Sequence, residues 1–289
     1  MRCLARAAVL LVLLLAPATA SALPPVWVVH DQDSTMVLFG SVHLLPQGLD
    51  WRPPQLKEAL GKADDVWFEA PMDGASQADA TEAATRGALL PAGQSLMKML
   101  SRSGRDRLTH AAALLDLPLD QLDRFRPWYA DLVVSVGLIE KFGGQRNEGV
   151  ERQLWEGLSP RAKRVGLETP AEQIGFFTSL SMHDQLASLN QTLKGVDTVQ
   201  SDYKTLLDAW MGGDVRVLDR EVVRPLRKAA PGLYAKVVLQ RNERWTEAIV
   251  RRLQGSGVTV VVVGMGHLIG PDGVPARLRA KGYDVEGPR

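Results

Sequence analysis

The run Val258–Val263 (VTVVVV) constrains the fold of this chain more than any other stretch after residue 22. It is the most apolar run there, and it leads directly into a glycine-rich loop. A strand without polar alternation is typical of a parallel sheet that helices cover on both faces. The run therefore predicts the central strand of an α/β fold.

Other strand-like runs lie mainly towards the two ends of the chain. Val26–His30 and Thr35–Gly40 flank a polar turn and predict a hairpin, and Val66–Glu69 predicts a third strand after a short helix. The order strand, helix, strand indicates a parallel βαβ unit. Arg164–Glu168 predicts a short buried strand, and Tyr283–Glu286 predicts a closing one.

Helical patterns fill the middle of the chain, over about 75–160 and 170–253. The clearest is Trp128–Phe142, where one apolar stripe contains Tyr129, Leu132, Val133, Val136, Ile139 and Phe142. We therefore predict one α/β domain over 23–289. Its central sheet is mixed and largely parallel, is built from N- and C-terminal strands, and receives a large helical insertion.

Residues 1–22 resemble a secretory signal peptide. Two arginines precede the apolar stretch Ala7–Ala16, and small residues at Ala20 and Ala22 offer cleavage sites. Ten apolar residues are too few for a membrane-spanning helix, which needs about 20. We expect export, to the periplasm or outside the cell, and no transmembrane segment in the mature chain.

Charge and cysteine content restrict the function. The full chain has 34 lysines and arginines against 33 acidic residues, so its formal net charge is +1. Loss of the first 22 residues removes two arginines and changes this charge to −1. Such a balance argues against nucleic acid as a partner. The lone cysteine, Cys3, also departs, so a site must use histidine, carboxylate and arginine groups.

Two short matches carry most of the chemical signal. Gly40-Ser-Val-His43 and Gly264-Met-Gly-His267 are both Gly-x-x-His, and each follows an apolar strand. Residues just past the carboxyl ends of parallel strands line the ligand crevice of an open α/β sheet. Glu69 ends a third strand, so we expect His43, Glu69 and His267 to converge at one rim.

Two chemistries are open to these three residues. Two histidines and a carboxylate on rigid strand ends suit a divalent metal ion, which makes a bound water a nucleophile near neutral pH. Without metal, the same groups are able to act as general base, orienting acid and electrostatic stabiliser. Arg241 lies near a predicted helix start and is able to reach an anionic substrate group.

The loop with Gly264, Gly266 and Gly270 also offers a dinucleotide-binding alternative. Pro271 begins a turn where a phosphate would need free helix N–H groups, which argues against this alternative. We therefore expect the glycines to serve the histidine loops.

Taken together, these residues resemble the TraB/GumN family, which is related to the Tiki proteases. The matching segments cover nearly the whole chain after residue 22 and are Phe39–Leu45, Trp67–Ala70, Gly166–Thr169 with Glu172 and Gln173, Arg241-Asn242, and Val263–Gly270. The resemblance implies an α/β fold shared with erythromycin-esterase-like proteins. It also implies an active site at His43, His267, Glu69 and Arg241. Many members have Gly-Ile-Asp where this chain has Gly149-Val-Glu151, so Glu151 receives no role at this point.

Two functions follow as hypotheses. The first is an exported, metal-dependent hydrolase of the Tiki type, with His43, Glu69 and His267 as metal ligands and Glu69 and Arg241 as catalytic residues. Its substrate would be a peptide, an ester or a polysaccharide-related compound. The second is a non-catalytic periplasmic binding or accessory protein, for example in exopolysaccharide assembly.

Overall fold

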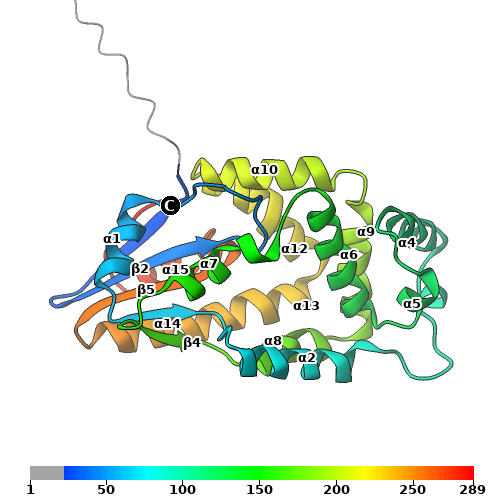
Figure 1. Ribbon diagram of the computed structural model, residues 1–289, viewed down its shortest axis with the longest axis horizontal. Helices are drawn as coiled ribbons and strands as arrows, with labels where there is room; N and C mark the ends of the chain where they lie inside the picture. Colours follow the sequence, from blue (N-terminus) through cyan, green and yellow to red (C-terminus); the bar gives the residue numbers. More distant parts are fainter. Residues whose placement is uncertain (1–22) are drawn as a thin grey trace, which may run out of the picture.

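A computed structural model describes residues 23–289 (Figure 1). The predicted signal peptide and its cleavage sites lie outside these residues. No helix in the described range is long and apolar enough to cross a membrane.

One six-stranded sheet forms the centre of the fold, in the order β4-β3-β5-β2-β1-β6. The strands are β1 (Val26–His30), β2 (Ser34–Ser41), β3 (Asp65–Phe68), β4 (Lys163–Gly166), β5 (Gly257–Gly264) and β6 (Val285–Glu286). Strands β2, β5, β3 and β4 run parallel, whereas β1 is antiparallel to both β2 and β6. The mixed, largely parallel α/β sheet that joins both ends of the chain is therefore confirmed.

Strand β5 occupies the centre of the sheet, as its valine run predicts. Its residues from Thr259 to Val263 are buried, and it pairs with β2 on one side and β3 on the other. The prediction for β4 is wrong in one respect, because this strand is half-exposed rather than buried. It lies at the edge of the sheet, where only one neighbour covers it.

Most of the helices between β3 and β5 form the insertion, which extends away from the sheet in Figure 1. The helical segments are α1 (Pro54–Lys62), α2 (Gly74–Ala88), α3 (Leu96–Met99), α4 (Arg102–Leu114), α5 (Leu119–Asp123), α6 (Pro127–Lys141), η1 (Arg146–Glu148), α7 (Val150–Gly157), α8 (Pro170–Thr178), α9 (Met182–Lys194), α10 (Val199–Met211), α11 (Val215–Leu218), η2 (Asp219–Val223), α12 (Arg224–Ala229), α13 (Pro231–Tyr234), η3 (Ala235–Leu239), α14 (Gln240–Leu253), η4 (Met265–His267) and α15 (Val274–Ala280). Segments η2 and η3 are π-helical, and η1 and η4 are 3₁₀ turns.

Three hydrophobic clusters support these parts of the described chain. The largest surrounds the sheet, a second lies among α4, α6 and α9 in the insertion, and a small third contains Leu180, Ala230 and Leu233. Helix α6 contributes Val134 and Leu138 to the core that it shares with α9, and Val133 of the predicted stripe packs against the same core. Elsewhere in that stripe Leu132 is exposed and Ile139 lines two cavities, so the stripe serves cavity walls as well as the core.

Candidate active site

The carboxyl ends of β2, β5 and β3 lie at the same edge of the sheet. Ser41, the last residue of β2, is paired with Gly264, the last residue of β5. Phe68 of β3 is paired with Val262 of β5, so Glu69 follows at nearly the same level. The two Gly-x-x-His loops and Glu69 therefore leave the sheet side by side.

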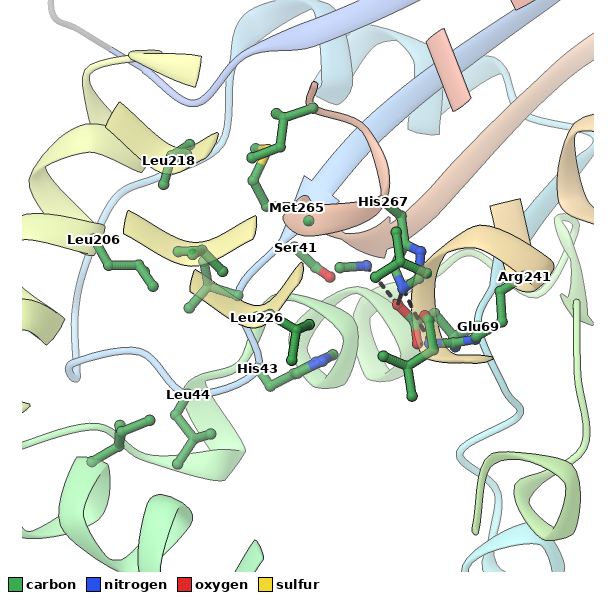
Figure 2. Close-up of a pocket in the computed structure, with 18 of the residues that line it drawn as sticks. Ser41, His43, Leu44, Glu69, Leu206, Leu218, Leu226, Arg241, Met265 and His267 are labelled. Atoms are coloured by element: carbon green, nitrogen blue, oxygen red, sulfur yellow. Dashed lines mark hydrogen bonds and ion pairs between the residues drawn. The ribbon is translucent and has the colours of Figure 1, made fainter. Parts of the chain in front are cut away.

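The side chains of His43, Glu69 and His267 surround one position beside the Gly264 Cα atom. A methyl group built there would lie 3.1 Å from Oε1 of Glu69, 3.6 Å from Cδ2 of His267 and 3.9 Å from Nε2 of His43. The same three residues and Gly264 line one cavity, so a ligand in that cavity would lie against these side chains (Figure 2). The expected convergence at one rim is present.

Arg241, in the first turn of α14, connects the residues of this cluster by hydrogen bonds. Its guanidinium donates to Oε2 of Glu69 at 2.6 Å, to Oε2 of Glu168 at 2.9 Å and to Nε2 of His267 at 3.0 Å. The side chain is 8% exposed, and its guanidinium carbon lies 4.5 Å from the centre of the Trp245 ring. Because its donors are occupied, Arg241 positions the other residues and is not free to clamp a substrate.

The preceding π-helical segment helps to hold Arg241. A π turn widens the helix and is often found at functional sites. Here the Val237 carbonyl, in η3, accepts a hydrogen bond from the Arg241 guanidinium at 3.2 Å. The backbone irregularity therefore supplies one more acceptor for a buried cation.

His267 is held as a neutral imidazole. The Asn242 amide nitrogen donates to the carbonyls of His267 and Asp272, so the amide oxygen faces Nδ1 of His267 at 2.6 Å. Nδ1 therefore carries the proton, and Nε2 accepts from Arg241. Burial, followed by the charges of Arg241 and His43, lowers the pKa of His267 to about 3 in spite of the opposing charge of Glu69.

Glu69 is held as a carboxylate. Burial acts to raise its pKa, but the charges of Arg241 and His43 outweigh this, and the pKa lies well below its ordinary value. The Gly264 N–H group also donates to Oε1 at 2.7 Å. Glu69 therefore remains ionised and fixed beside the open position.

His43 has the opposite environment, with Nδ1 2.7 Å from Oε1 of Glu151. Glu151 is buried and also accepts from the Ser41 hydroxyl at 2.5 Å. Chiefly through the charge of Glu151, the pKa of His43 is raised to about 9. The His43 side chain is 63% exposed, so solvent screens this pair but also reaches the imidazole.

A close backbone contact brings Glu151 to His43. A Cβ atom at Gly149 would lie only 2.1 Å from the His43 carbonyl oxygen, so only glycine allows α7 to begin there. Sequence reasoning missed the role of Glu151, although Gly149-Val-Glu151 was the available signal. It also missed Glu168, which lies just past the half-exposed β4 and holds both Arg241 and Arg244.

His43, His267 and Glu69 are the residues that would supply ligands to a metal ion. Both imidazoles have the outer hydrogen bond that metal ligands use, to Glu151 and to Asn242 respectively. Arg241, however, donates to Nε2 of His267 and to Glu69, and so takes the lone pairs that a metal would need. Within residues 23–289, no group of three or more histidine, cysteine or acidic residues is placed to hold a metal. The arrangement does not fit a metal while Arg241 lies there, and the predicted metal centre stays a prediction.

Comparison with known proteins assigns the family. The model of the TraB/PrgY/gumN family matches residues 25–287. The chain belongs to this family. This confirms the family resemblance read from the sequence, because the match covers most of the chain.

One relative of this TraB/PrgY/gumN member comes from Treponema pallidum (strain Nichols) and is described as an uncharacterized protein. The two are 24% identical over 187 residues, which is 61% of this chain and 56% of the relative. The chain thus spans little more than half the length of that relative. No solved structure matches the chain.

Proposed function

We propose that this TraB/PrgY/gumN family member is a hydrolase of ester or amide bonds in which His43 is the general base. The observation that carries the proposal is the position beside Gly264. The part of the cavity next to Gly264 is bordered by Nε2 of His43, Oε1 of Glu69 and the His267 ring. It has the right neighbours for a water molecule that attacks a substrate carbonyl group.

In this reaction, deprotonated Nε2 of His43 accepts a proton from the water while the water oxygen bonds to the carbonyl carbon. The bond from that carbon to the leaving oxygen or nitrogen then breaks, and His43 returns the proton to the leaving group. Glu151 keeps the proton on Nδ1 and stabilises the imidazolium that forms. Glu69 is placed to accept the second O–H group of the water.

Arg241 and His267 are positioning residues in this scheme. Arg241 holds the Glu69 carboxylate, and His267 gives the guanidinium a fixed acceptor on the side of the second glycine loop. Their burial makes the cluster rigid, which suits pre-organisation of a water and a carbonyl group.

A screen of ester and peptide substrates with the purified protein tests the proposal. His43→Gln removes the base and should lower kcat/KM by about 10²–10⁴-fold. His110→Gln is the matched control, because His110 is exposed and pairs with Asp197 away from the cavity. Full turnover by His43→Gln would contradict the assignment.

Metal dependence is a separate proposal for the same site, supported by the two imidazoles and Glu69 and opposed by the place of Arg241. Elemental analysis and dialysis against a chelator test it. Unchanged turnover after chelation would support the metal-free route. Turnover that is lost and then restored by one divalent ion would mean that the ion displaces Arg241 from Nε2 of His267.

A non-catalytic binding role is the second candidate. It is favoured by the way Glu69, Arg241 and His267 saturate one another and leave only His43 well exposed. Ligand binding in the same screen without any turnover would favour this role.

We also propose that residues 1–22 direct export of the protein. The motivation is the short apolar stretch Ala7–Ala16 with small residues after it. N-terminal sequencing of protein from an exporting host should show cleavage after Ala20 or Ala22. An intact N-terminus on protein that remains inside the cell would contradict export.

A further inference from the structure

The cavity that contains the site is charged at one end and aliphatic elsewhere. Figure 2 shows His43, Glu69, Arg241 and His267 near one another, with Leu206 and Leu218 well away from Glu69 and Arg241. The aliphatic wall comes mostly from the helical insertion and contains Ile139, Leu206, Leu218, Val222, Leu226, Val237 and Val238. This division separates a reacting end from a binding end.

The binding end offers few groups for hydrogen bonding. Tyr203 is the polar side chain there, and its hydroxyl already donates to the Leu44 carbonyl at 2.9 Å. Most of the wall lies in helices, where the backbone groups bond to one another. A peptide chain would bring N–H and C=O groups that need partners in such a wall, whereas a hydrocarbon chain would bring none.

Both π-helical segments contribute to this wall. Val222 lies in η2 and is 37% exposed, and Val237 and Val238 lie in η3. Because π turns recur at functional sites, their place in the wall of one cavity points to a ligand.

The volume of the cavity limits the length of the ligand. Its volume is about 350 Å³, at the lower end of the range for small-molecule sites. A methylene group needs about the volume of a liquid water molecule, roughly 30 Å³, so about ten carbons is the upper limit for a chain in this cavity, since the reacting end takes part of the same volume. A second cavity of about 580 Å³ adjoins the first and shares Ile139, Tyr203, Leu206 and Val222 with it.

We propose that the substrate is an ester or amide of a medium-length aliphatic acyl chain. The chain lies against Leu206, Val222 and Leu226, and the carbonyl carbon lies beside Gly264. Water adds to that carbon, and the bond to the leaving alcohol or amine breaks to give the free carboxylic acid and the alcohol or amine. This inference rests on the hydrolase function proposed above and adds the class of its substrate.

Calorimetric titration with acetate, hexanoate, decanoate and hexadecanoate tests chain binding without turnover. Affinity should rise roughly fourfold for each added methylene and stop rising beyond about ten carbons, when the cavity is full. Affinity independent of chain length would overturn the proposal. So would tighter binding of the capped peptide acetyl-Leu-Leu-Leu-amide than of decanoate, because that result would assign the wall to peptides.

Turnover of p-nitrophenyl esters of the same acids separates this inference from the proposed function. Decanoate binding without turnover of any ester would support the acyl cavity and overturn the hydrolase. Turnover that shows no preference for the ten-carbon ester over the two-carbon ester would support the hydrolase and overturn the acyl cavity. Both proposals are supported if the ten-carbon ester is preferred.

A matched pair of variants locates the chain. Leu206→Trp places a large ring in the cavity, whereas Leu207→Trp changes a half-buried neighbour on α10 that does not line it. The first should weaken decanoate binding about tenfold or more, since tryptophan displaces at least two methylenes. The second should bind decanoate as the parent protein does. Equal effects of the two variants would overturn the placement. Val222→Trp repeats the test at an exposed position if Leu206→Trp fails to fold.

Discussion

The ion pair between His43 and Glu151 determines how the proposed activity depends on pH. Glu151→Gln keeps the size of the side chain and an acceptor for the Ser41 hydroxyl but removes the charge. That charge is the largest cause of the raised pKa of His43, so the pKa should fall from about 9 towards 6.5. At about pH 7.5, such a fall raises the unprotonated fraction of His43 from roughly 3% to roughly 90%.

The pH profiles of kcat/KM for the parent and for Glu151→Gln should therefore differ in shape and not only in height. For a general base, kcat/KM rises with pH and levels off above the pKa of the free enzyme. The parent should reach half of its plateau near pH 9, whereas Glu151→Gln should do so near pH 6.5. The plateau of the variant should be lower, because Glu151 no longer stabilises the imidazolium formed in the reaction.

Histidine ring resonances in NMR measure the same pKa without turnover. The His43 signal is assigned from its loss in His43→Gln. Glu156→Gln serves as the control, because it neutralises an exposed acid on the same helix that pairs only with Arg152. A Glu151→Gln titration midpoint within about half a pH unit of the parent midpoint would refute the electrostatic argument.

Unfolding measurements give an independent check of the sign. A histidine whose folded pKa is raised adds stability that is fully present below the unfolded pKa of 6.5 and is lost as pH rises through about 9. When the pH rises from 6.5 to 9, the free energy of unfolding measured in urea should therefore fall more for the parent than for Glu151→Gln. Because the His43 side chain is 63% exposed, solvent screening keeps this difference small.

Two further substitutions test the site. Gly264→Ala puts a methyl group 3.1 Å from Oε1 of Glu69, against the space assigned to water, and should lower kcat/KM by about 10²-fold, whereas Gly266→Ala meets only Cγ2 of Val223, at 3.9 Å, and should not. Equal activity of both variants would contradict that assignment. Arg241→Met leaves buried Glu69 without its cation and should cost about 3–5 kcal/mol in urea unfolding. The half-exposed Arg244→Met should cost about 1 kcal/mol or less, and similar losses for the two would contradict the burial argument.

The sequence predicts those parts of the fold that depend on local pattern. The valine run of β5 specifies a strand buried on both faces, and the strand-end positions of His43, Glu69 and His267 follow from parallel pairing. The half-exposed β4 was mispredicted, because a short apolar run does not reveal whether a strand has one neighbour or two.

The partners of the site residues were beyond the reach of such patterns. Glu151 meets His43 only because the fold brings α7 against the first glycine loop, and Asn242 orients His267 across a similar tertiary contact. Helical periodicity likewise does not show that the stripe of α6 containing Ile139 faces cavities. A hydrophobic pattern predicts that a face of a helix or strand is buried, but it does not identify the element or cavity that lies against that face.

The two Gly-x-x-His loops show why the same motif need not have the same chemistry. His43 lies beside a buried carboxylate, so its pKa rises to about 9, and its exposed ring is able to exchange protons with solvent. His267 meets an amide oxygen on one side and a guanidinium on the other, so its pKa falls to about 3 and it keeps a fixed lone pair. In the proposed hydrolase, this asymmetry assigns proton transfer to the first loop and the positioning of Arg241 and Glu69 to the second.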